Sequence, residues 1–186
     1  MAKSERHIGG LFEIQINPDR CIYGLCVDFI RGGEFEVSMG HLMHFFHGTF
    51  TQPLSDPEEV LLSDLRFSGF INLNSFVRGK AAKRVASPEI PVELAGPIFF
   101  RNGCTPEMGE QPPRFVECVV RSYLNGKETL EDETRFSQEQ IRYMSSESLY
   151  LLPGIEHQYK YDCSPKHEFC FYQGLVETYS PTEPVF

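Results

Sequence analysis

The sequence predicts a mainly β, α+β fold: an antiparallel, strongly curved sheet or a small SH3-like barrel, with short helices. Apolar and polar residues alternate along several short segments, and Gly, Pro, Asn and Asp interrupt them. Helix-start signals are few. With 186 residues, the chain suits a single domain over 1–186, with a soft internal boundary in the Pro-rich stretch 104–113.

The first clear strand pattern lies near the N-terminus. Phe12, Ile14 and Ile16 alternate with polar residues, and a Pro/Asp turn separates them from a second alternating run over 21–29. Two such runs around a short turn predict a β-hairpin. Gly24 has no Cβ, so we expect another backbone or a ring to approach it closely.

The next elements follow the same pattern. Alternation predicts strands over 34–37, 41–50 and 65–71. Between the last two, Asp56 begins an Asp-Pro-Glu-Glu run, which predicts an N-cap, a proline in the first helical turn and a short helix. The stretch 73–84 then predicts a helical turn with a basic end.

The C-terminal part contains a second hairpin signal. A short buried segment over 98–103 precedes an alternating run over 114–124, which ends at Asn125-Gly126. An Asn-Gly pair is typical of a type I′ turn, because both positions tolerate positive φ. A helical turn follows near 138–144, the Pro153-Gly154 pair predicts a break, and 167–180 predicts a last strand.

Composition excludes several classes of protein. The net charge is −9, from 26 acidic and 17 basic residues, which argues against nucleic-acid binding and suits a basic protein partner. No apolar run reaches the roughly 18 residues typical of a membrane-spanning helix, so we expect no membrane partner. The first residues lack the apolar core of a secretory signal, which favours the cytoplasm and reduced, mostly buried cysteines.

Histidines are the candidate metal ligands. His41 and His44 are three residues apart in a predicted strand and would face opposite sides of a sheet. His157 follows Pro153-Gly154 and is similar to one cupin motif, but the chain has no His-x-His pair to complete it. A metal-dependent cupin-like enzyme using these histidines is therefore the alternative hypothesis, and no bound metal is the preferred one.

Motifs for catalysis are absent from the sequence. There is no GxSxG, HExxH, P-loop or CxxC, so we expect no catalytic residues, no cofactor and no enzymatic activity. An acidic group follows the Asn-Gly turn, and it is the candidate partner-binding surface. It consists of Glu128, Glu131, Asp132 and Glu133.

The chain resembles the immunity protein 26 family of bacterial toxin-immunity proteins. The shared features are an opening strand, a Pro/Asp turn and an aromatic-Gly pair, a short acidic helix leading to a strand, and a Pro followed by paired aromatics. In this chain they are Gly10, Phe12, Ile14, Ile16, Pro18, Asp19, Tyr23 and Gly24; Glu58, Glu59, Val60, Leu61 and Leu62; Leu65, Arg66 and Phe67; and Pro97, Phe99 and Phe100.

The resemblance implies a role and no reaction. Such a protein would bind and block the catalytic domain of a cognate polymorphic or contact-dependent toxin in the producing cell. If that toxin is a nuclease, its basic cleft would be a target for the acidic group. An SH3-like interaction module without a toxin is a further alternative.

Overall fold

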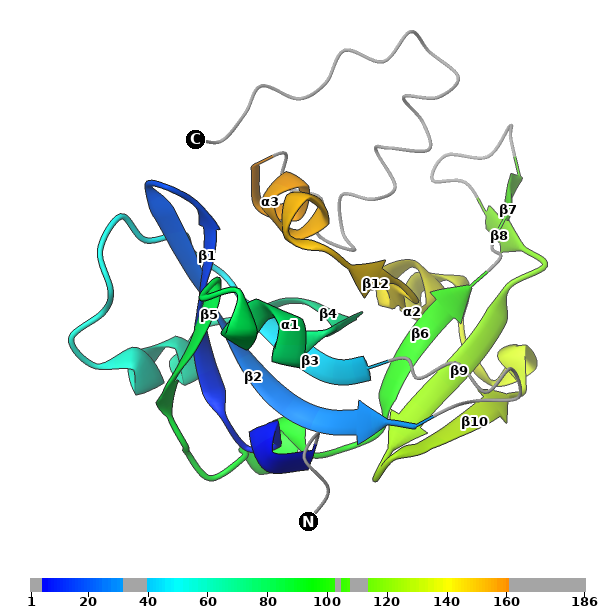
Figure 1. Ribbon diagram of the computed structural model, residues 1–186. Coiled ribbons are helices and arrows are strands. Elements are labelled where there is room, and N and C mark those ends of the chain that lie inside the picture. Colours follow the sequence, from blue (N-terminus) through cyan, green and yellow to red (C-terminus); the bar gives the residue numbers. More distant parts are fainter. Residues whose placement is uncertain (1–4, 32–39, 103–104, 108–113, 161–186) are drawn as a thin grey trace, which may run out of the picture.

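The computed structural model describes residues 5–31, 40–102, 105–107 and 114–160, which form short strands and short helices (Figure 1). In chain order the elements are η1 (Glu5–His7), β1 (Leu11–Asn17), β2 (Arg20–Ile30), β3 (Gly40–Phe46), η2 (Pro57–Leu62), β4 (Leu65–Ile71), α1 (Leu73–Arg78), β5 (Ala82–Ala86), η3 (Val92–Leu94), β6 (Ile98–Asn102), β7 (Thr105–Glu107), β8 (Arg114–Val116), β9 (Val119–Leu124), β10 (Lys127–Glu131), η4 (Glu133–Arg135), α2 (Gln138–Tyr143), β11 (Ser145–Ser146), β12 (Leu149–Tyr150) and α3 (Leu152–Lys160).

The main sheet has six strands in the order β12-β4-β3-β2-β1-β5. Its neighbours are antiparallel except for β12, which runs parallel to β4. The hairpin expected at the N-terminus is confirmed as β1 and β2, and the strand expected over 65–71 is confirmed as β4. Alternation predicted these strands correctly because each buries apolar side chains on a sheet face.

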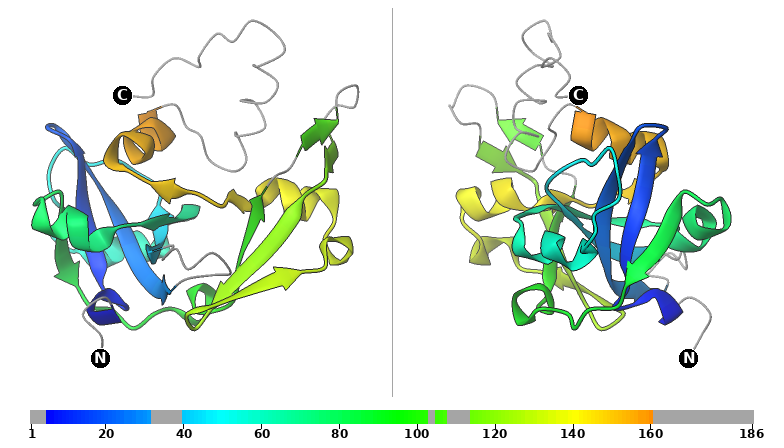
Figure 2. Two further views of the ribbon diagram at one scale, coloured as in Figure 1. Left: turned by 45° about the vertical axis from the view of Figure 1, so that its right-hand side comes forward. Right: turned by 90° about the vertical axis from the view of Figure 1, so that its left-hand side faces the viewer.

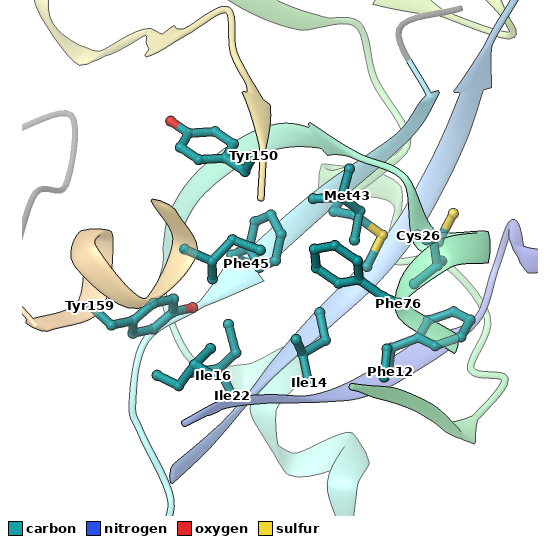
Figure 3. Close-up of a cluster of buried hydrophobic side chains, with 14 of the residues drawn as sticks. Phe12, Ile14, Ile16, Ile22, Cys26, Met43, Phe45, Phe76, Tyr150 and Tyr159 are labelled. Atoms are coloured by element: carbon teal, nitrogen blue, oxygen red, sulfur yellow. The ribbon is translucent and has the colours of Figure 1, made fainter. Parts of the chain in front are cut away.

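One face of the main sheet carries the largest apolar cluster. Phe12, Ile14 and Phe45 lie on it, and helices α1 and α3 cover it with Phe76 and Tyr159 (Figure 3). The approach expected at Gly24 is also confirmed, because an added Cβ there would lie 3.3 Å from a ring carbon of Phe45. Burying each of these large side chains stabilises the fold by roughly 1.5–3 kcal/mol.

The small sheet packs against the other face of the main sheet. Its strand order is β10-β9-β6-β11, antiparallel except for the β11–β6 pair. Phe100 and Tyr123 of this sheet meet Leu42 and Phe70 of the main sheet in one buried cluster. A separate two-stranded sheet consists of β7 and β8.

The Asn-Gly hairpin of the small sheet is confirmed. Asn125 has a φ of 53° and Gly126 a φ of 74°, and the turn joins β9 to β10. The expected strand over 114–124 is interrupted at Glu117, which has a φ of 56°, so that β8 and β9 are separate strands. A positive φ is incompatible with continued strand pairing.

Residues 145–150 connect the two sheets. Ser145 and Ser146 of β11 pair with β6, and the Leu149–Tyr150 strand β12 pairs with β4. Figure 2 shows this yellow-to-orange segment running from the small sheet back to the main sheet, where α3 follows. Segments from both ends of the described chain therefore complete the main sheet.

Asp28 makes a second link between the sheets. Its carboxylate accepts a 2.7 Å hydrogen bond from the backbone N–H of Gly126, in the hairpin turn of the small sheet. The same carboxylate accepts a 2.7 Å bond from the N–H of Phe29. Asp28 is only 9% exposed, and both of its hydrogen bonds are partly buried and charge-assisted.

The expected sheet geometry was wrong in its details. The fold is mainly β and α+β, as predicted, but neither sheet is closed or strongly curled, so there is no SH3-like barrel among the described residues. The sheets are also mixed, since β11 and β12 pair in parallel. Alternation specifies which face of a strand is buried and does not specify which strands become neighbours.

Several local predictions have different outcomes. Asp56 caps η2 as expected, accepting from the N–H of Glu58, but this helix is of the 3-10 type. Of the basic end expected on a helical turn, Lys83 and Arg84 instead lie in β5, and Lys80 lies between α1 and β5. The break expected at Pro153-Gly154 is wrong, because both residues lie within the first turn of α3. Backbone N–H groups in a first turn have no partner inside the helix, so a proline is tolerated there. The strands expected over 34–37 and 167–180 lie outside the described residues.

The cysteines differ from one another. Cys21 and Cys26 are free and buried, as expected. Desolvation raises the pKa of the Cys26 thiol to about 12. Cys118 is disulfide-bonded, so the expectation of reduced thiols is wrong at this position.

No helix of the described residues has the length and apolar character needed to cross a membrane.

Candidate functional site

The predicted acidic group lies at one edge of the small sheet. Glu128 and Glu131 belong to β10, which is the edge strand of that sheet. Asp132 and Glu133 follow directly, at the start of η4. The hairpin turn and the 3-10 turn thus bring all four predicted carboxylates to the same edge of the fold.

Two of these carboxylates form ion pairs with arginines of the hairpin and of η4. Glu128 forms a 3.0 Å ion pair with Arg121, which is also paired at 3.0 Å with Glu147. Glu131 forms a 3.1 Å ion pair with Arg135 and accepts a hydrogen bond from the Ser122 hydroxyl. These pairs hold the two carboxylates against the sheet and offset part of their charge.

The other two carboxylates differ: Asp132 caps a helix, and Glu133 faces solvent. Asp132 caps η4 by accepting from the backbone N–H and the hydroxyl of Thr134, and these hydrogen bonds lower its pKa. Glu133 is exposed. Their combined negative charge extends the charged edge beyond β10.

Sequence reasoning missed an apolar residue in the middle of this edge. Leu130 is 71% exposed, although it lies in β10 between the acidic positions. Burying an exposed leucine against a partner is favourable, so Leu130 is a candidate apolar contact inside a polar rim. The available signal was a leucine on an edge strand whose neighbours are all polar.

The three candidate metal ligands lie in different surroundings. His41 is buried, and its ring is 5.3 Å from that of His7 and 4.8 Å from that of Phe29. His44 is buried on the opposite face of β3, and His157 is exposed on α3. Among the described residues, no three His, Cys, Asp or Glu side chains are grouped so that they could hold a metal ion.

His44 lies in a pocket that the sequence did not predict. The pocket has a volume of about 610 Å³ and lies between β3 and β4, the segment around η3, and helix α2. Most of its walls are apolar, and a few polar groups converge on it. It is lined by His44, Leu65, Ser68, Glu93, Leu94, Gly96, Pro97, Ile98, Phe99, Phe136, Glu139, Gln140, Met144 and Ser145.

The buried end of the pocket is a chain of hydrogen bonds. His44 and Ser68 are cross-strand partners in β3 and β4, and His44 Nδ1 is 2.8 Å from Ser68 Oγ. His44 Nε2 is 3.3 Å from the carbonyl oxygen of Leu94. The backbone N–H of Ser68 donates to Ser145 Oγ at 3.0 Å.

These contacts assign the protonation of His44. Burial lowers the pKa of His44 to about 4, so the imidazole is neutral at pH 7. A carbonyl oxygen only accepts, so Nε2 carries the proton, and Nδ1 accepts from the Ser68 hydroxyl. The sequence signal for this site was a histidine and a serine inside two apolar strands, but their pairing depends on strand register.

No protein-family model matches the chain, and neither a curated protein nor a solved structure matches it.

Proposed function

We propose that this protein binds and neutralises a cognate bacterial toxin domain, possessing no catalytic activity of its own. The single observation that supports this role is Leu130, which is 71% exposed on an open edge strand that also carries Glu128 and Glu131. The resemblance to immunity protein 26 supplies the class of partner. Its place of action is the cytoplasm of the producing cell, because the toxin must be blocked there.

The anatomy of the edge supports a protein partner. Stable interfaces combine a few apolar anchors, which are desolvated on binding, with a polar rim. Here Leu130 would be the anchor, and Glu128, Asp132 and Glu133 would form the rim. β10 is an edge strand of the small sheet. A strand of the partner could therefore pair with β10 through backbone hydrogen bonds.

Charge supports a basic toxin surface. The chain has a net charge of −9, and complementary charge accelerates encounter with a basic partner. A nuclease, whose cleft must attract phosphates, is the class of toxin that fits best. The ion pairs of Glu128 and Glu131 keep their carboxylates in place, so less side-chain entropy is lost on binding.

The test uses the protein encoded by the adjacent gene as the candidate toxin. The full chain and the toxin domain are co-expressed, and affinity is measured by calorimetry. We expect Leu130→Ser to weaken binding by roughly 30-fold or more, the loss typical of an interface anchor. Leu62→Ser is the matched control, because Leu62 is 91% exposed on η2, in another part of the fold.

Charge is tested separately. The quadruple variant Glu128→Gln, Glu131→Gln, Asp132→Asn and Glu133→Gln should bind more weakly and with less dependence on salt concentration. Its thermal unfolding is compared with that of the wild type, because two of the four carboxylates hold ion pairs. Unchanged affinity and salt dependence in this variant, or an equal loss for Leu62→Ser, would place the contact surface elsewhere.

A further inference from the structure

We propose that the pocket beside His44 is a binding site for a small organic amine with an apolar body. This site is separate from the acidic edge, and it stands whether or not the protein neutralises a toxin. Four properties of the described residues lead to it: the volume of the pocket, the chemistry of its walls, the hydrogen-bonding groups at its buried end and the charge at its mouth.

The size and the walls suit a small molecule. Ligand pockets typically have volumes of about 300–1,000 Å³ and are mostly apolar. The volume here is about 610 Å³, and Leu65, Leu94, Phe99, Phe136 and Met144 provide apolar surface from separate elements. The two sheets and α2 hold these side chains in place, so the pocket exists before a ligand arrives.

The buried end offers one acceptor and one donor. Ser68 donates its hydroxyl proton to His44 Nδ1, so the Ser68 oxygen is left to accept a hydrogen bond. Ser145 Oγ accepts from the backbone N–H of Ser68, and its hydroxyl still has a proton to donate. Ser145 is 9% exposed, so this donor is largely shielded from bulk solvent. A hydroxyl or amide at the buried end of a ligand satisfies both serines.

The mouth carries negative charge. Glu93 and Glu139 both line the pocket and are exposed, and the described lining residues include no Lys or Arg. Two carboxylates at the mouth of an apolar pocket favour a cation and disfavour an anion. The ligand therefore carries its positive charge at the end that remains near solvent, with its apolar part inside.

The test compares two probes of similar size and opposite charge. 4-(4-Hydroxyphenyl)butylamine and 4-(4-hydroxyphenyl)butyrate, whose phenol hydroxyl can reach the two serines, are titrated into the full-length, isotope-labelled protein, and amide shifts are followed by NMR. We expect the amine to bind with a Kd of about 1 mM or tighter, with shifts concentrated at Ser68, Gly96 and Ser145. The butyrate should bind about tenfold more weakly.

Two sets of variants localise the site. Glu93→Gln with Glu139→Gln should abolish the preference for the amine, whereas Glu89→Gln, an exposed acid outside the pocket, should preserve it. Gly96→Trp should block both probes, and Gly96→Ala should not. An added Cβ at Gly96 meets nothing within 4 Å, so Gly96→Ala is compatible with folding, and the amide spectrum of Gly96→Trp shows whether that variant folds.

Equal binding of the two probes would overturn the proposal. Shifts mapping away from the pocket, or undiminished binding by Gly96→Trp, would also overturn it. The wild-type titration alone provides the first two of these readouts, so a variant that misfolds leaves the test decisive.

Discussion

Replacing Asp28 with Ala should loosen the contact between the two sheets. The carboxylate of Asp28 accepts from the N–H groups of Gly126 and Phe29, both at 2.7 Å. A hydrogen bond to a charged group contributes about 1.5–3 kcal/mol, so two bonds give roughly 3–6 kcal/mol. Gly126 is half-buried and water can replace the lost acceptor there, so we expect a loss of about 3 kcal/mol.

The assay is urea unfolding of the full chain, with Asp28→Asn as the matched variant. The asparagine keeps one acceptor oxygen, so it should lose about half as much stability as the alanine. Hydrogen exchange provides a local readout, because the amide of Gly126 should exchange faster in Asp28→Ala than global unfolding explains. A loss below about 1 kcal/mol, or unchanged exchange at Gly126, would refute the role of Asp28 as a link between the sheets.

Two further predictions concern packing and pH. Gly69→Ala should destabilise the fold by about 1–3 kcal/mol in urea unfolding, because the new Cβ would lie 2.5 Å from the Tyr150 ring; Gly96→Ala, with open space around its Cβ, should stay within about 0.5 kcal/mol of the wild type. The pKa of His44 is lowered from 6.5 to about 4. Between these pH values His44 is protonated in the unfolded chain and neutral in the folded chain. Stability should therefore fall by about 3 kcal/mol as pH decreases from 6.5 to 4, and His44→Gln should remove this part of the slope.

The hairpins were accessible to sequence reasoning because their signals are local. Alternation around a Pro/Asp turn predicted β1 and β2, and the positive φ that Asn and Gly tolerate predicted the turn between β9 and β10. The clustering of the four carboxylates was likewise accessible, because residues 128–133 follow that turn directly, whereas their role as a binding surface stays a prediction. The 71% exposure of Leu130 was missed, because exposure depends on which edge of the sheet remains uncovered.

The sequence by itself determined where the main hairpin strands lie, the two hairpin turns at 17–20 and 125–126, and the negative charge of the molecule. These depend on neighbours two to four residues apart, which the periodicity of the chain records. Only the tertiary structure decided that residues 145–160 return to the first sheet, that Asp28 reaches Gly126, and that His44, Ser68 and Ser145 meet at one pocket. The physical reason is that contacts between distant segments depend on strand order and register, and the two-residue strands β11 and β12 are too short to carry a periodic signal.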